Sequence, residues 1–145
     1  MKHKSRYVVA LLSMLVLTLA ACAPGASEES ILTVGGAVDS EQSLSMSGLE
    51  DIGVVDITAE HPRHGELPYQ GVRLNDVLDA AGVSSDASSV VFTASDDYSA
   101  EVPLADVTAC TDCLIAFNDE GGLDMVMPGM EGNTWVKDVV QIDVQ

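Results

Sequence analysis

Basic residues are scarce in this chain of 145 residues, which has six Lys and Arg residues against 23 Asp and Glu residues and a formal net charge of −17. Lys2, Lys4 and Arg6 lie at the N-terminus, and every acidic residue lies from Glu28 onward. A domain this acidic repels phosphate backbones, because nucleic-acid binding depends on Lys and Arg neutralising phosphate charge. The composition therefore excludes nucleic acid as a partner.

Several catalytic signatures are also missing. The sequence has no Gly-x-Ser-x-Gly turn, no glycine-rich phosphate loop and no dinucleotide-binding fingerprint, so hydrolase, kinase and nicotinamide-dependent functions have no support. Aromatic residues make up only 4% of the chain, but 47% of its residues are hydrophobic. Patterned apolar runs of this extent predict one folded domain, since they bury enough surface to offset the ordering entropy.

The first 22 residues have the order of a secretory signal. Three basic residues precede an apolar run from Tyr7 to Ala21, which ends at Cys22. A run of about 15 residues is too short for a transmembrane helix, which needs about 20. Residues 23–30 are small and polar, which predicts a flexible tether, and the folded domain is expected over residues 31–145.

The end of this run, Leu19 to Cys22, resembles the lipobox of bacterial lipoproteins. The resemblance implies that Cys22 is acylated and becomes the mature N-terminus. We therefore expect an extracytoplasmic protein that is anchored to the cell membrane through the lipid on Cys22.

The pattern within the domain predicts an α+β fold with a mixed β-sheet and one or two short helices. Leu74, Val77, Leu78 and Ala81 have helical spacing, and Gly82 follows where a helix would end. A second short helix is indicated by a Ser and a Glu at the spacing of a capping box, in residues 47–50. The polar stretch at residues 61–65 predicts a loop. Strands are predicted over 31–38, 53–59, 90–94, 98–104, 114–117, 123–127, 135–136 and 139–144.

Two short motifs carry candidate chemistry. Cys110 and Cys113 form a Cys-x-x-Cys pair, which in an oxidising compartment is a structural disulfide, two idle thiols or a redox-active pair. His61 and His64 are candidate metal ligands, and with the two cysteines they would make a four-ligand zinc set. We expect the two cysteines to be oxidised to each other in the mature protein, because an acylated Cys22 leaves them no other sulfur to pair with. Nothing in the sequence brings the histidines and the cysteines together.

Seven segments in the second half of the chain follow a pattern typical of one protein family: Tyr69–Leu74, Ala80–Val83, Val91–Tyr98, Leu114–Phe117, Met127–Gly129, Trp135–Val139 and Ile142–Val144. With these segments the chain resembles the oxidoreductase molybdopterin-binding domain family, which has the sulfite-oxidase-like fold. The resemblance implies that fold over the domain, with molybdopterin as the cofactor. Arg73 and Lys137 lie in matching segments, which implies that both are cofactor-binding residues. Family enzymes bind molybdenum through a cysteine, and the corresponding stretch here, residues 54–70, contains none.

Two functional hypotheses follow. The favoured one is a non-catalytic binding or accessory module, which keeps this fold to hold a small ligand or a partner subunit. The alternative is an oxidoreductase subunit that carries electrons through a molybdopterin, a metal or the Cys110/Cys113 pair.

Overall fold

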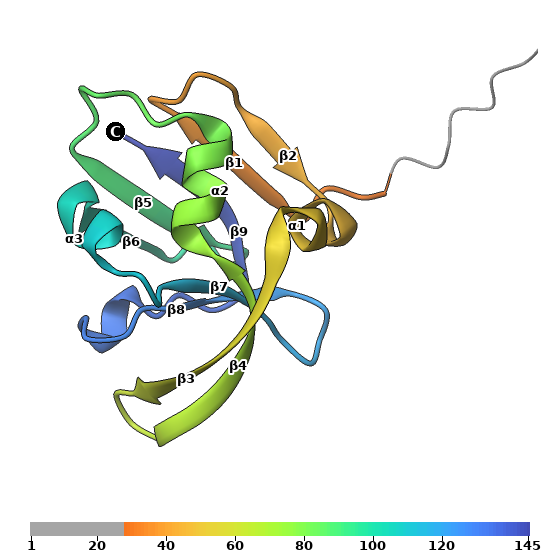
Figure 1. The fold of residues 1–145 in the computed structure, drawn as a ribbon, viewed down its shortest axis with the longest axis vertical. Helices are drawn as coiled ribbons and strands as arrows, with labels where there is room; N and C mark the ends of the chain where they lie inside the picture. The colour runs from red at the N-terminus through yellow and green to blue at the C-terminus, as the bar shows by residue number, and fades with distance from the viewer. Residues whose placement is uncertain (1–27) are drawn as a thin grey trace, which may run out of the picture.

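The computed structural model describes residues 28–145, and the predicted signal peptide and Cys22 lie outside this range. Residues 28–30, the end of the predicted tether, are exposed and have no regular structure. Within the described range no helix is long and apolar enough to cross a membrane. The elements, shown in Figure 1, are β1 (Leu32–Gly36), β2 (Gln42–Leu44), α1 (Met46–Gly53), β3 (Val54–His61), β4 (Gly65–Arg73), α2 (Leu74–Ala81), β5 (Ser89–Ala94), β6 (Ser99–Pro103), α3 (Leu104–Ala109), β7 (Leu114–Phe117), β8 (Leu123–Val126), the 3₁₀ turn η1 (Gly132–Thr134) and β9 (Val139–Val144).

The strands form two sheets. The larger sheet has the order β2-β1-β9-β5-β6 and is mixed, because β1 runs parallel to β9 while its other pairs are antiparallel. The smaller sheet has the order β3-β4-β7-β8 and is antiparallel throughout. The α+β prediction with a mixed sheet is confirmed. The division into two sheets and the third helix, α3, were not predicted.

The main core lies where α2 and both sheets meet, and α2 crosses in front of the larger sheet in Figure 1. The predicted apolar face of α2 is fully buried, and the central strands contribute side chains such as Phe92 and Ile142 with no exposed surface. Burying one such large apolar side chain contributes about 1.5–3 kcal/mol. A second, smaller cluster occupies the other face of the smaller sheet, around Leu114, Ala116 and Val126.

Two glycines, Gly82 and Gly36, occupy positions where a larger residue would be strained. Gly82 ends α2 in the left-handed conformation (φ 72°), and its N–H donates to the Leu78 carbonyl at 3.0 Å. Gly36, at φ 86°, lies so close to Val144 that a Cβ would fall 2.1 Å from the Val144 carbonyl oxygen. A side chain at this position would collide with the backbone of β9, so the pairing of β1 with β9 needs a glycine here.

The cap of α1 differs from the prediction. The short helix is present, but Ser45 is the N-cap, and its Oγ accepts a hydrogen bond from the Gly48 N–H at 3.1 Å. The predicted cap, Ser47, lies inside the helix. The capping-box spacing therefore predicted this helix correctly, but the helix begins two residues earlier than predicted.

The polar stretch at residues 61–65 is the tip of a hairpin and not an extended loop. Strand β3 runs to His61, and the register pairs His61 with Gly65 and Val54 with Val72. Only residues 71–73 of β4 pair with β7, so the far half of the hairpin extends beyond the sheet (Figure 1). Pro68 is tolerated there, because β4 has no second neighbour that would need its missing N–H.

The strand predicted over 98–104 is confirmed as β6, Ser99–Pro103, and the chain continues directly as α3. One predicted strand segment is wrong. Residues 135–136 belong to no strand, because η1 precedes them and β9 begins at Val139. This irregular segment, residues 127–138, lies near the β3–β4 hairpin and helps to form the candidate site.

Candidate functional site

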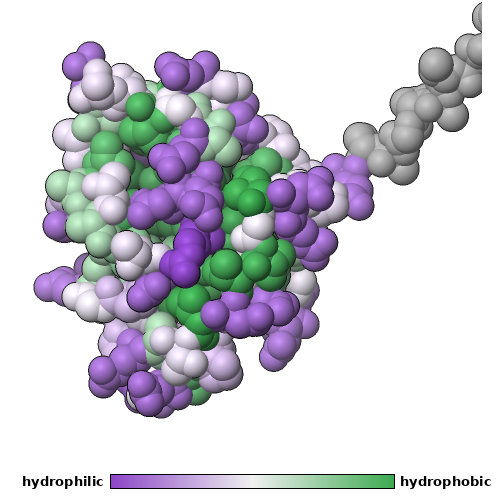
Figure 2. All heavy atoms as spheres, in the orientation of Figure 1, coloured by the Kyte–Doolittle hydropathy of each residue, from purple (hydrophilic) through white to green (hydrophobic). Residues whose placement is uncertain are grey.

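A cavity of about 430 Å³ separates the tip of the β3–β4 hairpin from the segment that follows η1. We call it the basic groove and define it by six of its lining residues: His61, Arg63, His64, Tyr69, Trp135 and Lys137. A neighbouring cavity of about 390 Å³ shares Arg63, Trp135 and Lys137 with the groove. Figure 2 shows hydrophilic side chains gathered at the lower end of the molecule, where the hairpin tip lies.

Aromatic rings line the groove. The ring of His61 lies 4.5 Å from that of His64 and 4.9 Å from that of Trp135, with an edge-on arrangement to the indole. The Tyr69 ring lies 6.1 Å from the Trp135 ring. These spacings are those of favourable aromatic pairs. Trp135 also packs against both apolar clusters, which holds this aromatic wall to the body of the domain.

The cations of the groove have no carboxylate partner within the described part of the chain. Residues 28–145 contain three Lys and Arg residues, and the single ion pair that they form joins Arg73 to Asp112 at 3.2 Å. Arg63 and Lys137 are exposed at the groove. A domain with 23 acidic residues therefore leaves two of its three cations unpaired at one cavity.

His61 is held in its neutral form. Burial lowers the pKa of His61 below its ordinary value, and the neighbouring cations of the groove lower it further. The Arg63 backbone N–H donates to His61 Nδ1 at 3.1 Å, so the neutral ring carries its proton on Nε2. The imidazole thereby offers an N–H donor.

One carboxylate, that of Asp124, also lines the groove. Its Oδ1 already accepts hydrogen bonds from Asn118 Nδ2 and from the Asp138 N–H, each at 3.0 Å. Burial raises the pKa of Tyr69, and the charge of Asp124 raises it further, so the Tyr69 hydroxyl stays protonated. These hydrogen bonds hold the Asp124 carboxylate to Asn118 and to the backbone of Asp138.

The indole N–H of Trp135 is buried and has no acceptor among the described residues. A buried donor without a partner costs about 1–3 kcal/mol. It belongs to a side chain of the groove wall, and the protein supplies hydrogen-bond donors there without matching acceptors. Such a donor set suits an anion.

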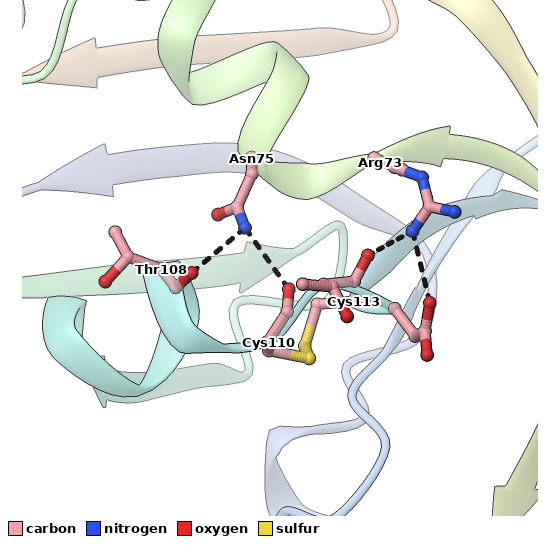
Figure 3. Close-up of polar contacts among 7 residues, drawn as sticks. Arg73, Asn75, Thr108, Cys110 and Cys113 are labelled. Atoms are coloured by element: carbon pink, nitrogen blue, oxygen red, sulfur yellow. Dashed lines mark hydrogen bonds and ion pairs between the residues drawn. A yellow bond between two sulfur atoms is a disulfide. The ribbon is translucent and has the colours of Figure 1, made fainter.

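The second sequence motif forms a separate feature. Cys110 and Cys113 are joined in a disulfide with an S–S distance of 2.08 Å. Figure 3 shows Arg73 and Asn75 reaching the disulfide loop, residues 110–113, from the junction of β4 and α2. Arg73 Nη1 donates to the Thr111 carbonyl, Asn75 Nδ2 donates to the Cys110 carbonyl at 3.2 Å, and the Leu74 N–H donates to the Cys113 carbonyl at 2.9 Å.

The structure separates the two residues predicted to bind a cofactor. Lys137 lines the basic groove, but Arg73 does not line it and is engaged with the disulfide loop. His61 and His64 lie together, but no third His, Cys, Asp or Glu completes a metal-ligand group within residues 28–145. The zinc set with the cysteines is not assembled, because both thiols are in the disulfide.

Molybdenum does not fit the donor set. Residues 54–70 hold no cysteine, and the two cysteines of the described range are oxidised to each other. The described residues therefore offer no thiolate, which is the ligand that the family resemblance implies for the metal.

Three groove residues, Arg63, Tyr69 and Trp135, were not predicted as site residues from the sequence. Arg63 could have been found, because each cation in so acidic a domain is a candidate for an anion site. Tyr69 and Trp135 are separated by more than 60 positions and carry no local signal that would bring them together.

Comparisons with known proteins identify the family and the fold of the chain. No curated protein matches it significantly. The crystal structure of the sulfane dehydrogenase SoxCD from Paracoccus pantotrophus has a similar fold, with a TM-score of 0.66 and 21% sequence identity over 78% of this chain. The match spans only 37% of that chain. The model of the oxidoreductase molybdopterin binding domain matches residues 23–145. The chain thus belongs to the oxidoreductase molybdopterin-binding domain family.

Proposed function

We propose that this protein is a non-catalytic binding module, which keeps the sulfite-oxidase-like fold and uses its basic groove to hold a ligand in place of a molybdenum centre. One observation carries the proposal. The described residues supply no thiolate for the metal, while a cavity with unpaired cations and an unsatisfied indole donor remains.

The proposed location is the outer side of the cell membrane. The acylated Cys22 would anchor the chain, because burial of each lipid methylene contributes about 0.8 kcal/mol. The small, polar residues 23–30 would hold the domain away from the headgroups, which its acidic surface repels where they are anionic. In this position the module would present a ligand, or its own surface, to a partner subunit.

The metal content of the purified full chain tests the binding module. The protein is expressed in a host that makes molybdopterin, and molybdenum is measured by mass spectrometry and pterin by fluorescence after oxidation. We expect far less than one equivalent of either. Near-stoichiometric molybdenum or pterin would overturn the proposal and restore the oxidoreductase hypothesis.

Partitioning in Triton X-114 tests the anchor independently. The full chain should enter the detergent phase, and Cys22→Ala should move it to the aqueous phase, because that variant has no site for the acyl chains. A Ser27→Ala variant, which leaves the cysteine intact, is the control. Unchanged partitioning of Cys22→Ala would contradict the lipid anchor.

One observation favours the alternative function, electron transfer through the cysteine pair. Half-buried Cys110 forms part of the wall of a cavity of about 620 Å³. The same wall contains Glu101, Asp106 and Glu131, and their charge disfavours the thiolate that a redox-active pair needs. The binding module is therefore the better supported function.

A further inference from the structure

We propose that the basic groove binds a small free anion, whose carboxylate or oxyanion group lies between Arg63 and Lys137 and whose body lies against Trp135. The inference rests on the proposed function and names the ligand class of the same site. It requires no metal, because every donor it invokes belongs to the chain itself.

The distribution of charge is the first argument. The described residues contain three cations among 23 acidic residues, and two of the three line the groove. The third, Arg73, is paired with Asp112. The cavity of about 620 Å³ beside Cys110, by contrast, is lined by three acidic residues and no basic residue. An anion therefore meets a favourable local field in the groove and an unfavourable one in that cavity.

The chemistry of the donors is the second argument. The Arg63 guanidinium presents donors in a plane that matches a carboxylate or an oxyanion, and Lys137 adds a compact positive charge. His61 is neutral with its proton on Nε2, and His64 stands beside it with a ring distance of 4.5 Å. The Arg63 guanidinium, the Lys137 ammonium and the His61 Nε2–H all donate hydrogen bonds.

The unsatisfied indole N–H is the third argument. Trp135 Nε1 is buried without an acceptor in the described chain, although most buried donors in proteins have a partner. Trp135 lines the groove, so an anion bound there would lie beside a side chain whose donor has no partner. The Trp135 ring would then also cover the apolar part of the ligand.

The carboxylates near the groove do not occupy these donors. Asp124 is bonded to Asn118 and to the Asp138 N–H. Asp96, in the neighbouring cavity, accepts a hydrogen bond from the Tyr98 N–H at 3.0 Å. Neither pairs with Arg63 or Lys137, so the two cations remain available to a ligand from solution.

Titration calorimetry with the full chain in a non-ionic detergent tests the inference. The probes are succinate and benzoate as carboxylates, sulfate and phosphate as oxyanions, a glutamate-rich peptide as an acidic protein segment, and choline as a cation control. Low ionic strength is needed, because salt screens exposed charges. We expect at least one anion to bind and choline not to bind. Binding of either anion class supports the inference and identifies the source of the charged group.

Variants decide whether binding belongs to the groove. Arg63→Gln and Lys137→Gln should each weaken anion binding by about tenfold, the effect of losing one charge-assisted hydrogen bond. Trp135→Phe keeps an aromatic ring, removes the N–H and should weaken binding by about fivefold. Arg73→Gln, which removes the same charge outside the groove, should change the affinity by less than about twofold. Circular dichroism confirms that each variant is folded.

Three outcomes would overturn the inference. The first is the absence of binding by all four anions at millimolar concentration in molybdenum-free protein, which leaves the proposed function standing. The second is an equal loss in Arg73→Gln and Arg63→Gln, which would show attraction to net charge alone. The third is binding of a glutamate-rich peptide without binding of any small anion, which would assign the groove to a protein partner. Molybdenum in the sample would instead overturn the proposed function.

Discussion

The basic groove and the disulfide loop contain similar residues and use them in opposite ways. Each combines a spaced pair, His61 with His64 or Cys110 with Cys113, and at least one of the few cations of the domain. At the disulfide loop the cysteines are bonded to each other, and Arg73 is bonded to Thr111 and Asp112. At the groove the cations have no carboxylate partner among the described residues. The cysteines and the cation at the disulfide loop are therefore already bonded within the protein. The cations of the groove have no such partner and can interact with a ligand.

This difference separates a structural role from a binding role more clearly than the motifs do. Both motifs suggested metal or redox chemistry from their spacing alone. In the structure, the closed loop connects the start of α2 to the end of α3, and the open groove faces solvent. Changes at the loop should therefore alter stability, and changes at the groove should alter ligand binding.

Reduction of the disulfide should have the largest effect on stability. Closure of a loop of four residues stabilises the folded state by about 2 kcal/mol in the chain-entropy model. Urea denaturation of the reduced and oxidised protein measures the difference, and the Cys110→Ala/Cys113→Ala double variant serves as a thiol-free reference. Anion affinity should not change on reduction. A large loss of anion binding would contradict the separation of the two regions.

The oxidation state of the purified protein is checked by mass before that comparison. Alkylation without a reductant should add no alkyl group, because both sulfurs of the pair are bonded to each other. Two added groups would show free thiols.

Arg73→Met should have the next largest effect. The methionine keeps the apolar part of the side chain, removes the donor to the Thr111 carbonyl and breaks a pair whose side chains are 35% and 64% exposed. We expect a loss of about 1 kcal/mol, since an exposed ion pair contributes little and the hydrogen bond contributes the rest. The matched variant Lys137→Met should stay within about 0.5 kcal/mol of the parent in the same urea experiment. A larger loss of unfolding free energy for Lys137→Met than for Arg73→Met would contradict the structural role of Arg73 and the binding role of Lys137.

The sequence predicted those parts of the fold whose signal is local. Helix α2 was predicted from four apolar positions at helical spacing and a glycine at the end. The strands of the β5–β6 and β7–β8 hairpins were predicted from apolar and β-branched runs. Strand β4 was missed, because Pro68 and several polar residues interrupt its pattern. It is a strand because residues 65–72 pair with β3 and residues 71–73 pair with β7.

The groove could not be predicted as a unit. His61 and Arg63 are brought to Trp135 and Lys137 by the hairpin and by the irregular segment before β9, which are far apart in the sequence. The carbonyl groups of the disulfide loop accept hydrogen bonds from residues 73–75, which lie more than 30 positions away in the sequence. Long-range contacts of this kind leave no periodic pattern in the chain.

Titration of His61 should give the smallest effect on stability and the most direct measure of the groove. Its pKa is lowered in the folded state, first by burial and then by the nearby cations. Protonation therefore favours the unfolded chain, and stability that is present above the ordinary histidine pKa declines as the pH falls through the lower folded value.

Nuclear magnetic resonance of the imidazole signals follows this titration. In Lys137→Gln the pKa of His61 should rise toward its ordinary value but not reach it, since burial is the larger cause. A saturating anion should raise it in the parent protein, because a negative charge beside the ring favours the protonated form. Arg73→Gln should leave it unchanged, since Arg73 does not contribute to the shift. A His61 pKa that responds equally to Arg73→Gln and Lys137→Gln would show that the cations act on the domain as a whole and would remove the electrostatic distinction between the groove and the disulfide loop.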